Sequence, residues 1–494
     1  MERGKNVLAI DLGASSGRAI LANFDGKRIR LEELHRFLNE PVQLNQTLYW
    51  DVLRLMHDIK IGLQKAAKVT FQSVGIDTWG VDFGLLDEDG NLLENPVHYR
   101  DKRTEGMLEL AFSRYDKERF YELSGNQFME INTVFQLLSL TNSRQLLLPR
   151  AKTLLLMPDL LNYFLTGVKA SEYTIASTTQ MLHARDKVWS EEILHSLGLP
   201  KGILTKIIEP GTVLSPIRKE ILEELMIKPA SVVAVAGHDT QCAMAAIPAK
   251  EEDFLFLSCG TWSLFGTELK EPLISEKSKQ YNMTNEGGYG GKISFLKNII
   301  GLWLMQESQR QWAREGLKLT FSELEEEAQK AAPWKAFLDP DAPEFVAPGN
   351  IPERIRDYCK RTNQEVPKEI GEYVRLINES LALKYRYVME QIEDCTQKSY
   401  DTIYLVGGGV KSRLLCQMTA NACRKKVVAG PAEATVYGNA ALQLIALGEI
   451  SDLAKAREYI RNSEDMICYE PQEENRWKKA YQRFLLLCGL NSNG

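Results

Sequence analysis

A polar turn near the start of the chain carries residues suited to phosphate chemistry. The apolar run 7–10 ends at Asp11, and the turn 13–18, rich in glycine and serine, leads into a second apolar run. This pattern predicts a β-hairpin whose turn offers backbone N–H groups, two hydroxyls and an arginine. Such a concave set of donors suits phosphate oxygens, and Asp11 suits the hydrated magnesium ion that accompanies a phosphate. An ordinary glycine turn without a ligand fits the same letters.

A carboxylate in the middle of the chain has the position expected of a catalytic base. The apolar run 232–236 predicts a buried strand, and Gly237, His238 and Asp239 follow it directly. There Asp239 could accept a proton from a substrate hydroxyl while that oxygen attacks phosphorus. The alternative is that Asp239 caps the helix that follows. His238 suits either a sugar hydroxyl or a buried structural role.

Two later glycine-containing turns are further candidates for ligand binding. Residues 254–266 again read as strand, Gly/Thr turn and strand, and Gly407–Gly409 separate a predicted strand from a predicted helix. Turns without side chains let a flat ring or a phosphate approach the backbone. A plain hairpin and a tight strand–helix turn are the structural alternatives. The sequence has no GxxxxGK[ST] motif and no GxGxxG after a strand, which argues against P-loop and Rossmann sites.

Two further runs combine aromatic and polar side chains. Residues 74–84 are predicted as one strand, and the aromatic, hydroxyl and carboxylate groups of 77–82 are typical of a sugar pocket. The alternative is that Trp79 belongs to the core. Asn298, Trp303 and Gln306 are predicted to share one helix, where packing and solvated amides would explain them equally well.

Composition and length indicate the general class of the chain. It has 494 residues, 44% hydrophobic and 26% charged, and a net charge of −6 without a basic block. These values are typical of a globular protein of two or more domains and argue against nucleic acid or a membrane as a partner. We expect a cytoplasmic location, because no signal-peptide pattern precedes the first strand and the eight cysteines form no CxxC or zinc-like cluster.

The order of the predicted elements is α/β throughout. Asp51 is predicted to cap the helix that follows it, and apolar steps of three and four from Ile370 to Ile392 predict a long amphipathic helix. A charged segment at 250–253 predicts a boundary between an N-terminal domain, 1–248, and a C-terminal domain, 249–494. Each half begins with a strand–turn–strand motif. We therefore predict duplicated domains that face each other across a cleft.

Together these motifs resemble the FGGY carbohydrate kinases of the actin-like ATPase superfamily. The resemblance covers nearly the whole chain, from 9–18 to 429–435, and its most characteristic stretches are 75–83, 99–101, 156–159, 258–264, 285–288 and 297–304. It implies two ribonuclease-H-like α/β domains that flank a hinged catalytic cleft. The N-terminal half would bind mainly the sugar, and the C-terminal half mainly ATP.

The resemblance also implies roles for individual residues. Asp239 would be the catalytic base, and Asp11 would organise Mg²⁺ through water. The sugar would meet Gly80, His238, Asp239, Thr240 and Asn298. ATP would meet Ala14, Ser15, Ser16, Gly17, Arg18, Thr261, Gln306 and a glycine of the third turn, Gly407 or Gly408.

The reaction implied is transfer of a phosphoryl group from MgATP to the C1 hydroxyl of the ketose L-rhamnulose, by a monomer or a homodimer. One alternative within the family is a kinase for another ketose or polyol, such as L-fuculose or xylulose, because these sugars differ only in hydroxyl configuration or one methyl group. Alternatives from other classes are a non-catalytic actin-like ATP-binding protein and a purely structural protein.

Overall fold

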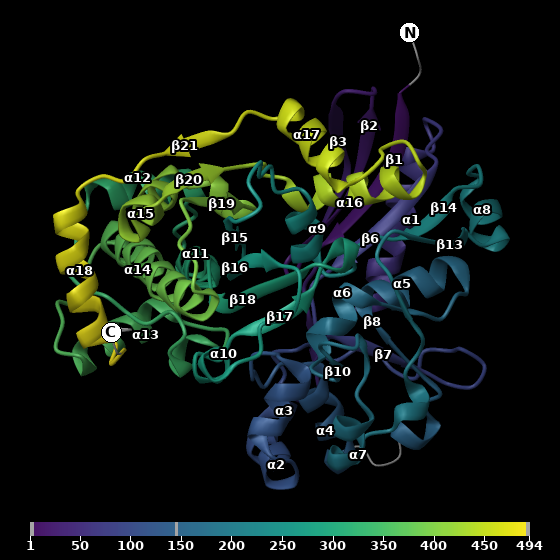
Figure 1. Cartoon of the computed structure of the whole chain (residues 1–494), viewed down its shortest axis with the longest axis horizontal. Coiled ribbons are helices and arrows are strands. Elements are labelled where there is room, and N and C mark those ends of the chain that lie inside the picture. The colour runs from purple at the N-terminus through teal and green to yellow at the C-terminus, as the bar shows by residue number, and fades with distance from the viewer. Residues whose placement is uncertain (1–3, 144–146, 491–494) are drawn as a thin grey trace. The chain divides into compact units, whose positions relative to one another are not determined.

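In the computed structural model, residues 4–143 and 147–490 are described, and the chain divides into two compact units (Figure 1). Unit 1 consists of Met1–Pro248, Leu269–Phe295 and Ala434–Glu464, and unit 2 of Ala249–Glu268, Leu296–Glu433 and Asp465–Gly494. The chain first leaves unit 1 next to the boundary predicted at 248/249. Two segments of the predicted C-terminal half nevertheless pack in unit 1, and both contribute to the site described below.

Unit 1 is organised around a six-stranded sheet. Its order is β13 (Thr212–Pro216), β14 (Ser231–Ala234), β6 (Ser73–Thr78), β1 (Lys5–Leu12), β2 (Ser16–Phe24) and β3 (Ile29–Leu38). Strands β14, β6 and β1 are parallel to one another. The pairing of β1 with β2 is antiparallel, which confirms the predicted first hairpin.

Helices cover both faces of this sheet because alternate residues of a strand point to opposite sides. Leu8 and Ile10 of β1 share a core with α1 (Val52–Ala66), which Asp51 caps as predicted, and with α5 (Met157–Thr166). Ala9, which lies between them, instead packs with Val436 of α16 (Ala434–Ala446). Helix α9 (Asp239–Ala245) lies against α16. The apolar side of α16 is therefore buried on this sheet, which explains why a late segment belongs to unit 1.

The predicted single strand 74–84 is wrong. Strand β6 ends at Thr78, Val81 has a φ of 69°, and Phe83 starts a separate strand, β7 (Phe83–Leu86), which pairs with β8 (Thr153–Leu156). The buried carboxylate of Asp82 accepts hydrogen bonds from two indoles and an amide. These buried contacts hold Asp82 in a turn, and the strand is broken there.

Unit 1 contains further short elements. The strands are β4 (Val42–Leu44), β5 (Thr47–Tyr49), β9 (Ser171–Glu172), β10 (Leu182–His183), β11 (Val188–Trp189), β12 (Ile207–Ile208) and β17 (Thr284–Gly287). The helices are α2 (Met107–Arg114), α3 (Lys117–Ser124), α4 (Thr133–Ser143), α6 (Tyr173–Ala176), α7 (Glu191–Leu197), α8 (Lys219–Leu225), α10 (Glu276–Gln280) and α17 (Leu453–Ser463).

Unit 2 repeats the strand plan of unit 1. Its strands lie in the order β18 (Ile293–Ile300), β16 (Trp262–Leu269), β15 (Leu255–Cys259), β19 (Thr402–Val406), β20 (Lys426–Ala429) and β21 (Ile467–Tyr469). Strands β15 and β16 form the predicted second hairpin, and β15 runs parallel to β19. In each unit an antiparallel hairpin thus lies next to parallel strands, β6 and β14 in unit 1 and β19 and β20 in unit 2.

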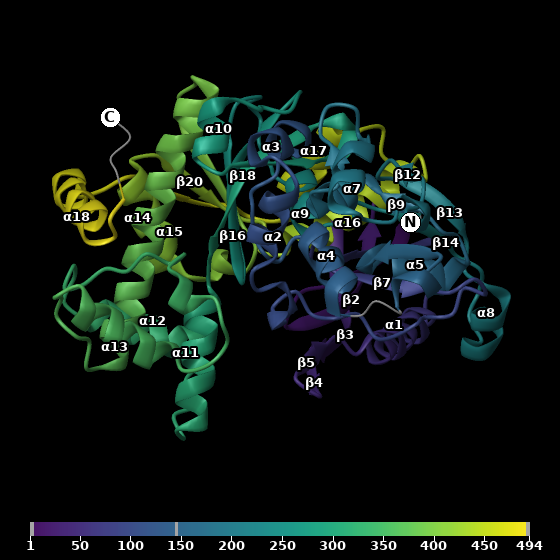
Figure 2. The ribbon, with the colours of Figure 1, turned by 90° about the horizontal axis from the view of Figure 1, so that it is seen from below.

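The helices of unit 2 are α11 (Trp303–Arg314), α12 (Phe321–Lys330), α13 (Ile351–Arg361), α14 (Ile370–Thr396), α15 (Arg413–Cys423) and α18 (Glu474–Leu487). Helix α11 contacts α13, and α12 packs along α14, the long amphipathic helix expected from the sequence (Figure 2). The prediction that Asn298 shares a helix with Trp303 and Gln306 is wrong, because Asn298 lies in strand β18. Gly301 separates that strand from α11, and a Cβ there would clash with Ser263.

Within residues 4–143 and 147–490, no helix has the length and apolar character needed to cross a membrane. All eight cysteines are free thiols, and Cys468 is the exposed one among them.

Candidate active site

Three carboxylates of unit 1 gather where its parallel strands end. Asp11 and Asp77 are register partners on β1 and β6. The N–H of Thr78 donates a 2.9 Å hydrogen bond to the carbonyl of Gly237, which brings the segment after β14, with Asp239, to the same edge. The charges of Asp11 and Asp239 both raise the pKa of Asp77. In open α/β sheets this edge, at the carboxyl ends of the strands, is where ligands bind.

Asp77 lies beneath this site. Its side chain is fully buried, and Oδ2 accepts a 2.6 Å hydrogen bond from Nδ2 of Asn439 on α16. Burial, followed by the charge of Asp11, raises the pKa of Asp77 well above its usual range. Asp77 therefore supports the site from below and is not a group that meets a sugar at the surface.

Asp239 has the geometry of a base that a ligand can reach. It is the first residue of α9, and His238 occupies the N-cap position, so the alternative interpretation as an N-cap is not supported. Its Oδ1 accepts a 2.6 Å hydrogen bond from the N–H of Thr240, and its side chain is 29% exposed. Desolvation and the charge of Asp11 raise the pKa of Asp239 to about 6, against the opposing effects of His238 and Thr240. A base with a pKa just below neutrality is well matched to proton abstraction.

His238 connects Asp239 to a carboxylate that the sequence motifs did not predict as a site residue. Its Nε2 lies 3.6 Å from Oδ1 of Asp239, and its Nδ1 lies 3.1 Å from Oε2 of Glu286 on β17. The sequence signal was present, because Glu286 belongs to the characteristic stretch 285–288, but nothing in the local pattern linked that stretch to His238.

The first Gly/Ser turn, predicted to bind phosphate, closes the β1–β2 hairpin. The N–H of Gly13 donates a 2.9 Å hydrogen bond to the carbonyl of Ser16, and Ser15 is exposed at the tip. Arg18 forms a 2.5 Å ion pair with Asp11 across the hairpin. A Cβ on Gly17 would clash with the ring of Phe37, so this glycine is needed for close packing. The predicted phosphate donor and the predicted magnesium-organising residue thus lie together, paired with each other.

The residues predicted for ATP in unit 2 lie at the second hairpin turn or against the end of its first strand. The hydroxyl of Thr261 donates a 3.1 Å hydrogen bond to Oε1 of Gln306 on α11. The Gly407–Gly409 turn packs against Cys259, the last residue of β15, and Gly407 has a φ of 82° that favours glycine. The carboxyl ends of the parallel strands β15 and β19 therefore carry both turns. Gly408 lies between Gly407 and Gly409, which both pack against Cys259.

The predicted sugar-pocket run is divided between core and turn. Trp79 is 6% exposed and packs against Trp50 in a tilted arrangement with ring centroids 4.1 Å apart, so its core alternative is confirmed. Asp82 is fully engaged by buried donors, and burial raises its pKa to about 6. Gly80 remains half-exposed in the turn beyond Thr78, with Thr178 beside it.

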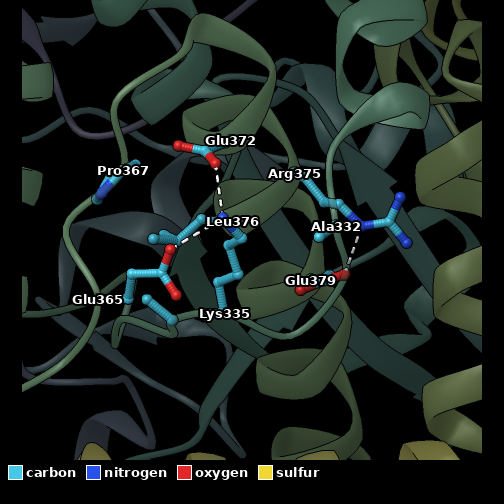
Figure 3. A pocket seen from close by; sticks show the side chains of 9 residues that line it. Ala332, Lys335, Glu365, Pro367, Glu372, Arg375, Leu376 and Glu379 are labelled. Atoms are coloured by element: carbon cyan, nitrogen blue, oxygen red, sulfur yellow. Dashed lines mark hydrogen bonds and ion pairs between the residues drawn. The ribbon is translucent and has the colours of Figure 1, made fainter.

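A separate pocket in unit 2 lies between α14 and the segments 332–336 and 365–367, and it is lined by paired charges (Figure 3). Lys335 contacts Glu365 and Glu372, each at 2.8 Å, and Arg375 contacts Glu379 at 2.8 Å. The lysine and the arginine of this pocket are thus paired with carboxylates of the same pocket. Across the described part of the chain, no group of three or more His, Cys, Asp or Glu side chains is arranged to hold a metal ion directly.

Sequence comparison decides the family. Residues 6–246 match the N-terminal domain of the FGGY family of carbohydrate kinases, and residues 255–447 match the C-terminal domain. The chain belongs to the FGGY family of carbohydrate kinases. This confirms the predicted resemblance and the predicted class of enzyme, an ATP-dependent sugar kinase.

Several relatives of this FGGY kinase cover nearly its whole length. It is 41% identical to a rhamnulokinase of Bacteroides thetaiotaomicron, over 97% of this chain and 99% of that one. It is also 41% identical to a rhamnulokinase of Oceanobacillus iheyensis, over 94% and 97%, and 36% identical to one of Bacillus subtilis, over 95% and 96%.

Solved structures confirm the predicted fold of this FGGY kinase. A ligand-bound xylulose kinase from Lactobacillus acidophilus superposes with a TM-score of 0.79 at 18% identity, covering 98% of this chain and 97% of that one. A glycerol kinase from Plasmodium falciparum with ADP gives 0.76 at 16% identity, with 98% of each chain covered. Both are distant in sequence, so they show the shared actin-like ATPase fold of two α/β domains and nothing about the substrate.

Proposed function

We propose that this kinase transfers the γ-phosphoryl group of ATP to the C1 hydroxyl of L-rhamnulose, giving L-rhamnulose 1-phosphate and ADP. The identity of 36–41% to proteins named rhamnulokinase, over at least 94% of the chain, supports the choice of sugar. The observation that carries the chemistry is Asp239, a 29% exposed carboxylate at the carboxyl ends of parallel strands with a pKa raised to about 6.

In this mechanism Asp239 accepts the proton of the C1 hydroxyl as its oxygen attacks phosphorus. His238, Thr240, Gly80 and Asn298 contact the sugar. Of these, His238 and Thr240 are supported by their contacts with the Asp239 carboxylate.

ATP is held by two groups of residues in this proposal. The first is the turn of Ala14, Ser15, Ser16, Gly17 and Arg18. The second consists of Thr261, Gln306, Gly407 and Gly408, whose gathering at the ends of β15 and β19 supports a shared role. The sugar is assigned mainly to the N-terminal domain, 1–248, and ATP mainly to the C-terminal domain, 249–494.

Asp11 is the residue that would organise Mg²⁺ through water. Two observations fit this role: Asp11 lies beside the phosphate turn, and the neighbouring Asp77 has a buried Oδ1 without a hydrogen-bond partner among the described residues. The ion would neutralise charge on the phosphates of ATP. That the enzyme is a monomer or a homodimer, and that it acts in the cytoplasm, stay predictions.

A substrate panel tests the proposal. ADP release with MgATP should be much faster with L-rhamnulose than with L-fuculose, L-xylulose, D-xylulose or glycerol. Preference for another sugar would keep the family and reject the named substrate. ATP binding without turnover on any sugar would favour the non-catalytic alternative.

Asp239→Asn tests the role of the base. It keeps the size of the side chain, so we expect normal ATP binding and a loss of turnover of about 10²- to 10⁴-fold. Asp186→Asn is a matched control, because Asp186 is an exposed residue of unit 1 whose contact is a local pair with His183. Near-normal turnover of Asp239→Asn would reject Asp239 as the base.

A further inference from the structure

Glu286 is a buried carboxylate for which the proposed reaction has no role so far. It is 4% exposed and lies on β17, in the segment Leu269–Phe295 that returns to unit 1. We propose that Glu286 is a positioning residue that holds the His238 ring with Nε2 toward Asp239 and maintains the positive charge beside that base. This inference rests on the proposed function, since it assigns a purpose to the neighbourhood of Asp239.

The contacts form a chain of three ionisable groups. Oε2 of Glu286 lies 3.1 Å from Nδ1 of His238, and Nε2 on the other side of the ring lies 3.6 Å from Oδ1 of Asp239. The Nδ1 contact is an ion pair without the alignment of a regular hydrogen bond. The other contact of Glu286, with Nε2 of Gln241, is longer at 3.4 Å. The carboxylate is therefore directed mainly at the imidazole.

Other residues hold the backbone of the same loop. The N–H of Gly237 donates a 2.8 Å hydrogen bond to Glu172, and the N–H of His238 donates a 3.3 Å bond to the hydroxyl of Thr174. Thr174 in turn donates to Glu172 at 2.6 Å. Because the loop is anchored through Glu172, the loss of charge on Glu286 should change the ring and leave the loop path intact.

The charges around the ring explain what Glu286 contributes. Burial of His238 opposes its charged form, but the carboxylates of Glu286, Asp239 and Glu172 outweigh burial and raise the pKa of His238 above its usual value. Glu286 contributes most among the three. The positive imidazolium then lowers the pKa of Asp239, which desolvation and Asp11 would otherwise raise further. Without Glu286, His238 should become neutral at a lower pH and Asp239 should hold its proton to a higher pH.

Glu286→Gln tests this directly, because it removes the charge and keeps the shape. Side-chain ¹⁵N NMR of the full-length protein, with His238 assigned by its loss in His238→Gln, should show the pKa of His238 falling by about one unit or more. The acidic limb of kcat/KM against pH should move upward by a similar amount, with KM for ATP unchanged. Glu286→Asp, which keeps a shorter carboxylate, should restore part of both shifts.

A control variant separates this role from a structural one. Glu379→Gln also neutralises a buried carboxylate, one that pairs with Arg375 in unit 2. It should lower thermal stability without moving the pH profile or the His238 titration. An unchanged His238 pKa and pH profile in Glu286→Gln would overturn the inference.

The NMR readout needs no sugar, so it remains informative if L-rhamnulose proves not to be the substrate. If Glu286→Gln does not fold, the same two measurements on Glu286→Asp decide. The wild-type sugar panel separately reports whether the proposed function fails.

Discussion

Nδ2 of Asn439 donates a 2.6 Å hydrogen bond to Oδ2 of Asp77, although 362 positions separate the two residues in the chain. Asn439 also donates to the carbonyl of Gly75 and accepts from Gln443, whose side chain reaches the carbonyl of Leu8. Helix α16 is thereby joined to β1 and β6 by polar contacts directly beneath the candidate catalytic edge.

Asn439→Leu should therefore destabilise the protein. The change leaves the Asp77 carboxylate and the Gly75 carbonyl without their buried donor, and we expect the free energy of unfolding to fall by about 1–3 kcal/mol. Urea denaturation measures this. Glu449→Gln breaks the more exposed ion pair with Lys5 and should cost less than about 1 kcal/mol. Equal stability of the two variants would contradict the structural importance of the Asn439 network.

The activity should depend on pH in a defined direction. Desolvation and Asp11 raise the pKa of Asp239 to about 6, and the base must be unprotonated to accept the sugar proton. We therefore expect kcat/KM to rise through a midpoint near pH 6 and to level off above it, measured between pH 5 and 8 with saturating MgATP. A rate that stays constant from pH 5 to pH 7 would argue against Asp239 as the base.

Thr261→Val should weaken ATP binding. It removes the hydroxyl that donates to Gln306 at the β15–β16 turn and leaves that amide without this partner. The loss of one hydrogen bond should raise KM for ATP by about 2- to 10-fold and leave KM for the sugar unchanged. Thr261→Ser keeps the hydroxyl and should behave as wild type. A change confined to the sugar KM would move Thr261 out of the ATP site.

Gly409→Ala should damage the strand–helix turn of unit 2. A Cβ at Gly409 would overlap the side chain of Cys259, and a buried overlap of this kind costs about 1–3 kcal/mol. Thermal denaturation should show a lower Tm. Gly202→Ala is the matched control, because a Cβ there meets no atom within 4 Å. If both variants melt together with wild type, close packing is not the reason for Gly409.

Local patterns in the sequence predicted much of the fold. Apolar alternation and turn residues located the hairpins at 5–24 and 255–269, and steps of three and four located α14. Asp51 was recognisable as a cap, because capping depends on residues within one turn of helix. Two errors, the single strand 74–84 and the helical Asn298, fell where distant contacts override local preference, at buried Asp82 and at Gly301 packed on Ser263.

The sequence by itself determined the family, the candidate base Asp239 and the residues of the candidate phosphate turns, because these depend on residue type and short spacing. The tertiary structure alone decided which carboxylates meet. It placed Asp77 beside Asp11 through strand register, Asn439 beneath Asp77 through α16, and Glu286 against His238 through a returning segment. Such pairings arise when separate segments bury their apolar faces on one sheet, and the spacing of residues along the chain does not record that packing.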